Sequence, residues 1–66
     1  MNIVEMAIYT EDKEQPNPTK ENWIVNLEGG VQLVGVIENL YNGHFRVKTA
    51  PDVFFDASKV VSLSRA

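Results

Sequence analysis

Residues 23–49 read WIVNLEGGVQLVGVIENLYNGHFRVKT, and residues 53–65 read VFFDASKVVSLSR after a proline break. Together they contain five short runs in which apolar and polar side chains alternate, the pattern of a strand with one buried face. Gly29-Gly30 and Asn42-Gly43 separate runs in the way that tight hairpins require. Five strands in so few residues predict a mainly β fold, a small, strongly bent, open barrel.

The second predicted strand, residues 31–37, carries a glycine in its middle. Gly35 has no Cβ, so its position predicts a sharp bend or the close approach of another backbone. In the next strand, Phe45 and Val47 are expected to face the core. Residues 50–52 (Ala-Pro-Asp) are expected to form a turn, because proline cannot donate to a strand ladder.

The chain divides into an N-terminal extension with a linker, residues 1–22, and a β-barrel, residues 23–66. Residues 3–10 (IVEMAIYT) fit either a helix or a strand, since eight residues are too few to decide between the two periods. Residues 11–22 are charged and contain Pro16 and Pro18. Because two prolines disrupt regular hydrogen bonding, this stretch is expected to be an exposed linker.

Size and composition point to a single domain that associates with itself. A chain of 66 residues buries only about 60% of its unfolded surface, so its stability as a monomer is marginal. It has no cysteine, which excludes disulfides and thiolate metal sites. Small domains without such cross-links often depend on oligomerisation.

Charge and hydropathy restrict the partners. The net charge is −3; residues 1–33 carry six acidic and two basic side chains, and residues 34–66 carry three and four. An acidic chain has no general attraction for phosphates, so any nucleic-acid site needs local geometry that gathers basic groups. No segment approaches the roughly 20 apolar residues of a membrane span, and the N-terminus is acidic. A cytoplasmic location is therefore expected.

Catalytic chemistry is hard to assemble from these residues. Three serines (Ser58, Ser62 and Ser64) and one histidine occur without a nucleophile-elbow or triad signature. Gly29-Gly30 lacks the lysine and helix of a phosphate-binding loop. A metal site on His44 would need carboxylates or symmetry copies, since no second histidine exists. The sequence thus predicts no enzyme, no cofactor and no metal.

Residues 23–65 resemble the Sm-like superfamily, nearest to its bacterial Hfq branch. Leu27, Gly29-Gly30, Leu33, Gly35 and Ile37 resemble the first Sm motif: a strand, a glycine turn and a strand with a central glycine. Residues 57–65 (ASKVVSLSR) are similar to the second motif, in which a short link leads to a Val-Val strand and a final Ser-Arg. The resemblance extends to small Sm-like proteins of marine metagenomic or phage origin. Another SH3-like barrel is the alternative.

The resemblance implies a cyclic homo-oligomer of about five to seven subunits, built by pairing the fourth strand of one subunit with the fifth of the next. Both strands are short, apolar and poorly guarded by charge, which independently favours edge pairing. The predicted interface residues are Val53, Phe54, Phe55, Val60, Val61 and Leu63.

The same resemblance implies RNA binding. Tyr41 is the best candidate for base stacking, because this hairpin lines the pore of Sm-like rings. Turn chemistry alone accounts for the neighbouring Asn42. His44, Arg46 and Lys48 form an outward basic stripe that could contact phosphates, although a solvated strand face is the plainer interpretation. The full predicted RNA-binding set is Tyr41, Asn42, His44, Arg46, Lys48, Phe55 and Lys59.

One departure from the family weakens the RNA prediction. Hfq carries a Tyr-Lys-His run that binds uridine, and this chain has Phe54, Phe55 and Asp56 at the matching positions. The two phenylalanines, being adjacent, should point to opposite faces, one into the core and one outward. The leading hypothesis is a non-catalytic ring that acts as a scaffold or chaperone for short RNA. The alternative is a protein-interaction or structural ring that does not bind RNA.

Overall fold

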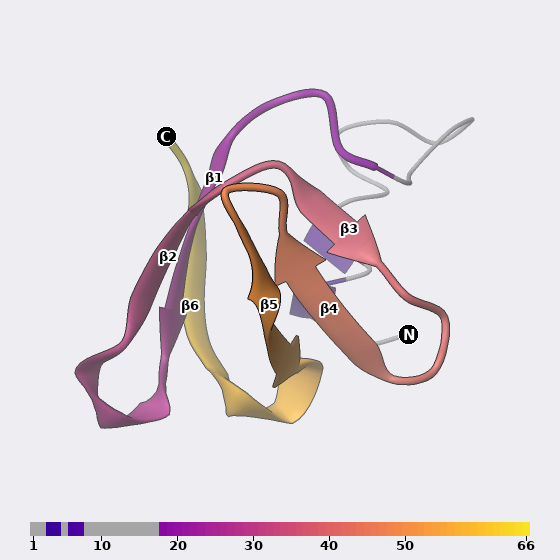
Figure 1. Cartoon of the computed structure of the whole chain (residues 1–66). Helices are drawn as coiled ribbons and strands as arrows, with labels where there is room; N and C mark the ends of the chain where they lie inside the picture. Colours follow the sequence, from indigo (N-terminus) through magenta and orange to yellow (C-terminus); the bar gives the residue numbers. More distant parts are fainter. Residues whose placement is uncertain (1–2, 5, 8–17) are drawn as a thin grey trace.

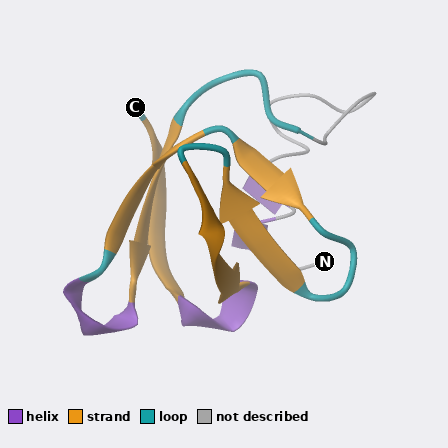
Figure 2. Cartoon of the chain, in the orientation of Figure 1, coloured by secondary structure: helices purple, strands orange, loops and turns teal. Residues whose placement is uncertain are grey.

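Six short strands form two three-stranded antiparallel sheets (Figures 1 and 2). The structure is a computed structural model that describes residues 3–4, 6–7 and 18–66. One sheet has the order β2-β1-β6 and the other β3-β4-β5. The predicted mainly β fold is confirmed at this level. The strands are β1 (Trp23–Leu27), β2 (Gln32–Gly35), β3 (Ile37–Asn39), β4 (His44–Val47), β5 (Ala50–Asp56) and β6 (Val60–Arg65), with 3₁₀ turns η1 (Glu28–Gly30) and η2 (Ala57–Lys59).

The second predicted strand is divided between the two sheets, which is why six strands are present where five were expected. Only Val36 separates β2 from β3, yet β2 pairs with β1 and β3 pairs with β4. The chain bends at Gly35, which is buried. A Cβ at Gly35 would lie 2.7 Å from Thr49 Oγ1 and 3.3 Å from Val47 Cβ. The predicted bend is therefore present at this glycine, and the groups that come close are the side chains of Val47 and Thr49 rather than another backbone.

Substitution of Gly35 should prevent folding. In Gly35→Val the side chain would collide with Thr49, whose hydroxyl donates a 2.6 Å hydrogen bond to the Val34 carbonyl. We expect loss of soluble, folded protein, measured by expression yield and circular dichroism. Gly43→Asn is the control: a Cβ at Gly43 would meet no atom within 4 Å, and the strain of φ +88 is least for asparagine among the non-glycine residues. Equal folding of both variants would contradict the assigned role of Gly35.

The hairpin turns agree with the sequence in one case and differ in another. Gly29 and Gly30 both have positive φ, 81 and 78, in the expected turn between β1 and β2. The turn predicted at residues 50–52 is wrong, because the chain reverses at residues 48–49 and Val47 lies opposite Ala50. Residues 50–52 instead begin β5. Pro51 is tolerated there because β5 is an outer strand.

The core lies between the two sheets and contains the side chains that the alternation predicted. Phe45 and Val47 are fully buried, and Phe55 is 4% exposed. The rings of Phe45 and Phe55 stack with centroids 6.0 Å apart. Phe54, on the other face of β5, is 56% exposed, so the expected division between the two phenylalanines is confirmed. The buried apolar residues are Val4, Trp23, Val25, Ile37, Phe45, Val47 and Phe55.

The N-terminal extension contributes to this core. The described residues of the ambiguous segment, 3–4 and 6–7, are helical. Val4 is fully buried in the core cluster, and Ala7 packs against it. Thr19 is also buried: its N–H donates to the Ile37 carbonyl at 3.1 Å, and its hydroxyl accepts the Ile37 N–H at 2.9 Å. Most of the predicted linker, including Pro16, lies outside the described residues.

The burial of Val4 can be tested against its exposed neighbour. Val4→Ala removes two buried methyl groups and leaves a cavity, so it should lower the free energy of unfolding by about 1.5–3 kcal/mol. Ile3→Ala, at a position 51% exposed, should change it by less than about 0.5 kcal/mol. Urea denaturation measures both. Equal effects would show that the extension does not pack as described.

Candidate functional site

The outer strands β5 and β6 each pair with a single strand of the described chain. On the outer side of β3, by contrast, the first residue, Ile37, makes two hydrogen bonds with Thr19. Beside β2, the Val34 carbonyl accepts the Thr49 hydroxyl, and the Val36 carbonyl accepts the Lys48 N–H at 3.0 Å. Within the described chain β5 and β6 are thus outer strands that pair on one side only, which is the arrangement of an open edge.

The six predicted interface residues divide into two groups. Phe55 is buried in the core, and Val60 and Leu63 pack against it, so these three hold the fold together. Val53, Phe54 and Val61 are 42%, 56% and 66% exposed. Large apolar side chains on unpaired edges are candidates for contact with another chain.

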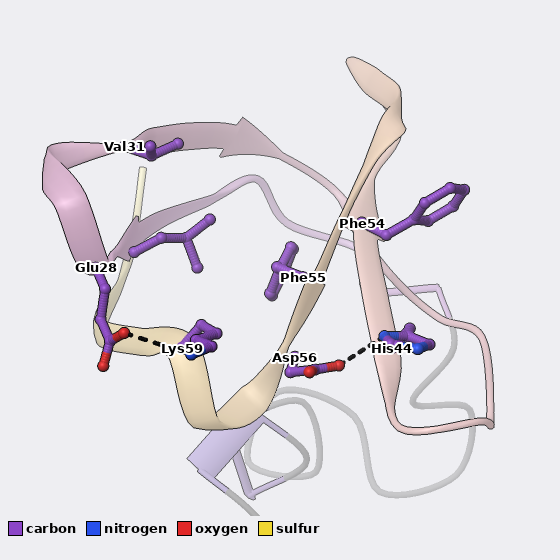
Figure 3. Close-up of a pocket in the computed structure, with 8 residues that line it drawn as sticks. Glu28, Val31, His44, Phe54, Phe55, Asp56 and Lys59 are labelled. Atoms are coloured by element: carbon purple, nitrogen blue, oxygen red, sulfur yellow. Dashed lines mark ion pairs between the residues drawn. The ribbon is translucent and has the colours of Figure 1, made fainter.

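A hollow of about 450 Å³ opens between η1 and η2 beside β5. Figure 3 shows Phe55 pointing towards this hollow and Phe54 pointing away from it. Two ion pairs flank it: Lys59 Nζ lies 3.7 Å from Glu28 Oε2, and His44 Nδ1 lies 2.6 Å from Asp56 Oδ1. The residues that line it are Leu27, Glu28, Val31, His44, Phe54, Phe55, Asp56 and Lys59.

Two residues of the predicted basic stripe, His44 and Arg46, lie against acids of the neighbouring strands. Arg46 Nε lies 3.1 Å from Glu38 Oε1, and Arg46 Nη1 donates to the Pro51 carbonyl at 3.4 Å. His44 lies against Asp56 and Lys59 against Glu28. Among the basic residues predicted to contact RNA, Lys48 therefore makes no ion pair within the described chain. Phe55 cannot stack on a base, because it is 4% exposed.

Tyr41 is held out into solvent by the loop between β3 and β4. It is 75% exposed and has φ 61, a conformation that residues other than glycine seldom adopt. Two side chains brace the loop: Asn39 Oδ1 accepts the Tyr41 N–H at 2.8 Å, and Asn42 Oδ1 accepts the His44 N–H at 3.1 Å. The loop therefore holds the backbone of Tyr41 in place and leaves its ring exposed to solvent. The role of Asn39 was not predicted, although an Asn two residues before a turn position is a usable signal.

The chain matches no known protein family, no curated protein and no solved structure in the comparisons. Within residues 3–4, 6–7 and 18–66, no three His, Asp or Glu side chains gather closely enough to hold a metal ion. In the same residues, no helix has the length and apolar character needed to cross a bilayer.

The positive φ of Tyr41 allows a test of whether this side chain contributes to stability. Asparagine adopts positive φ more readily than tyrosine, and Tyr41 buries little surface. Tyr41→Asn should therefore leave the melting temperature unchanged or raise it by a few degrees, as for a gain of up to about 1 kcal/mol. Differential scanning calorimetry measures this. A clear fall in melting temperature would show that the ring has a structural role.

Proposed function

We propose that this chain is an Sm-like module that assembles into a closed ring of about five to seven copies and serves as a non-catalytic scaffold or chaperone for single-stranded RNA. The observation that supports the proposal is that β5 and β6 are each an outer strand, one of each three-stranded sheet, and carry the exposed apolar side chains of Phe54 and Val61. Different edges that pair between copies form a heterologous contact, which closes into a ring when the rotation between copies permits.

Ring closure would repeat every loop around a symmetry axis. Tyr41 then occurs once per subunit, and each base stacked on an aromatic side chain contributes about 1–3 kcal/mol. Repetition raises the overall affinity for RNA, because linked sites have a high effective concentration for a strand that is already bound at one of them. Because His44, Arg46 and Lys59 are paired with acids, stacking rather than phosphate contact should supply most of the affinity.

A second candidate function is a ring or edge module that binds protein. It is favoured by the same ion pairs, which reduce the positive charge available to phosphates, and by the net charge of −3. The exposed apolar side chains of Val53 and Phe54 are also typical of protein contacts. Absence of RNA binding by the assembled protein would favour this function.

Assembly is tested by multi-angle light scattering at micromolar concentration. We expect one species with the mass of about five to seven chains, because a domain of this size is only marginally stable alone. A clean, folded monomer across the accessible concentrations would rule out the ring.

RNA binding is tested by titrating labelled poly-U and poly-A oligomers into the assembled protein at two salt concentrations. Tyr41→Asn should weaken binding at least about tenfold through loss of stacking, and Tyr41→Phe, the matched control, should bind like the wild type. Salt should weaken binding only modestly, since few phosphates are neutralised. Uridine preference should be reduced or absent, because Phe55 and Asp56 replace the Lys-His pair of Hfq. Failure of both oligomers to bind at low salt would overturn the RNA proposal.

A further inference from the structure

Asn42-Gly43 is the only asparagine-glycine pair in the sequence. Both residues are exposed in the loop between β3 and β4 (Figure 1). An asparagine side chain reacts with the backbone nitrogen of the next residue when the two can meet: the nitrogen displaces ammonia from the carboxamide, and a succinimide ring closes. Glycine obstructs this approach least, because it has no Cβ. The pair is therefore open to a chemical modification that its turn-forming role does not involve.

The group that would attack, the backbone nitrogen of Gly43, is unprotected. Among the residues that the structure describes, none accepts a hydrogen bond from the Gly43 N–H. A Cβ at Gly43 would meet no atom within 4 Å, so the peptide group lies in open space. A protected backbone nitrogen reacts only after its hydrogen bond opens, and here no such opening is needed. The nitrogen can therefore lose its proton to solvent and approach a carbonyl carbon.

The group that would be attacked, the Asn42 carboxamide, is held along the chain in the direction of Gly43. Its Oδ1 accepts the N–H of His44, two residues on, at 3.1 Å. The same N–H can stabilise the negative charge that develops on Oδ1 when the carbon beside it is attacked. Asn42 also lines a hollow of about 360 Å³ with Leu40, His44 and Phe54, which leaves room for ammonia to depart and water to enter.

A second asparagine in the same loop shows the opposite arrangement. Asn39 Oδ1 accepts the N–H of Tyr41, again two residues on, at 2.8 Å. The residue that follows it is Leu40, however, and the Leu40 N–H donates to the His44 carbonyl at 3.1 Å. The two asparagines thus share one side-chain hydrogen bond and differ at the next nitrogen, which is bonded and obstructed by a side chain after Asn39 but not after Asn42.

We propose that Asn42 is a site of self-modification, at which the Gly43 nitrogen converts the carboxamide to a succinimide and solvent water opens that ring to aspartate or isoaspartate. The bond from the Gly43 nitrogen to Asn42 Cγ forms, the Cγ–Nδ2 bond breaks, and the nitrogen's proton leaves with ammonia. Water then adds its hydroxyl to one of the two ring carbonyls and returns a proton to the nitrogen. No atom is oxidised or reduced.

Both products change the loop that carries Tyr41. Each product adds one negative charge to a chain whose net charge is already −3. Isoaspartate also places one more carbon in the main chain, inside the turn closed by the hydrogen bond from Leu40 to His44. A carboxylate next to Tyr41 would repel the phosphates of a bound strand, so RNA binding should decline as the protein ages. This consequence, unlike the modification itself, rests on the proposed function.

Mass spectrometry of the full-length protein tests the modification. The chain is kept at slightly alkaline pH for several days and digested with trypsin, which leaves Asn39 and Asn42 in one peptide, residues 21–46. We expect Asn42 to gain the mass of an amide-to-acid conversion at least about tenfold faster than Asn39, whose reaction must first break the Leu40 hydrogen bond. A sample digested without incubation measures conversion during the digest.

The same chain in urea shows what the fold contributes. Folded and unfolded protein should convert Asn42 at rates within about threefold of each other, because the Gly43 nitrogen is already unprotected in the fold. Asn39 should convert more slowly in the folded protein than in urea. Strong protection of Asn42 by folding, or equal rates at Asn42 and Asn39 in the folded protein, would overturn the proposal.

Two variants test the consequence for RNA. Asn42→Asp carries the charge of the product, and Asn42→Gln keeps a neutral amide. At low salt Asn42→Asp should bind labelled poly-U about threefold more weakly than Asn42→Gln, and the difference should shrink as salt rises. Equal binding would overturn the effect on RNA and leave the modification intact. A wild-type protein that binds no RNA would overturn the proposed function and this effect, while the mass measurement decides the modification separately.

Discussion

The close approach of the backbone at Gly35 is the constraint on which the rest of the structure depends. With no side chain at this position, Val47 and Thr49 come against the bend, and one continuous segment can serve both sheets as β2 and β3. The core between the sheets exists because of this bend. The positions of β5 and β6 also depend on this bend, since each strand is an outer strand of one of the two sheets.

The features that the sequence predicted well are those that depend on near neighbours. Alternation placed Phe45 and Val47 in the core, and the glycines marked the turn after β1 and the bend. The ion pairs could not be predicted this way, because the pairing of Arg46 with Glu38 requires the register of two strands. The burial of Val4 depends on packing across a long sequence separation, and no local pattern indicates it.

In the candidate site too, local features were predicted and contacts between strands were not. Tyr41 was predicted as a base-stacking residue because the resemblance places its hairpin at the pore of a ring, and its side chain is exposed as that role requires. The basic stripe has the expected outward direction, but the acids on the neighbouring strands change its chemistry. A pattern of charges along one strand therefore says little about net potential until the strands beside it are known.

Thr19 has a consequence for the geometry of growth. Its two hydrogen bonds to Ile37 occupy part of the outer side of β3, so in the proposed ring β5 and β6 are left as the two pairing edges. In the language of polymer chemistry, such a subunit has a functionality of two, so it can form only rings or unbranched chains. Removal of the cover would raise the functionality to three, and subunits of functionality three form branched networks and gels. In the proposed assembly, a single buried threonine would thus favour rings and chains over branched networks.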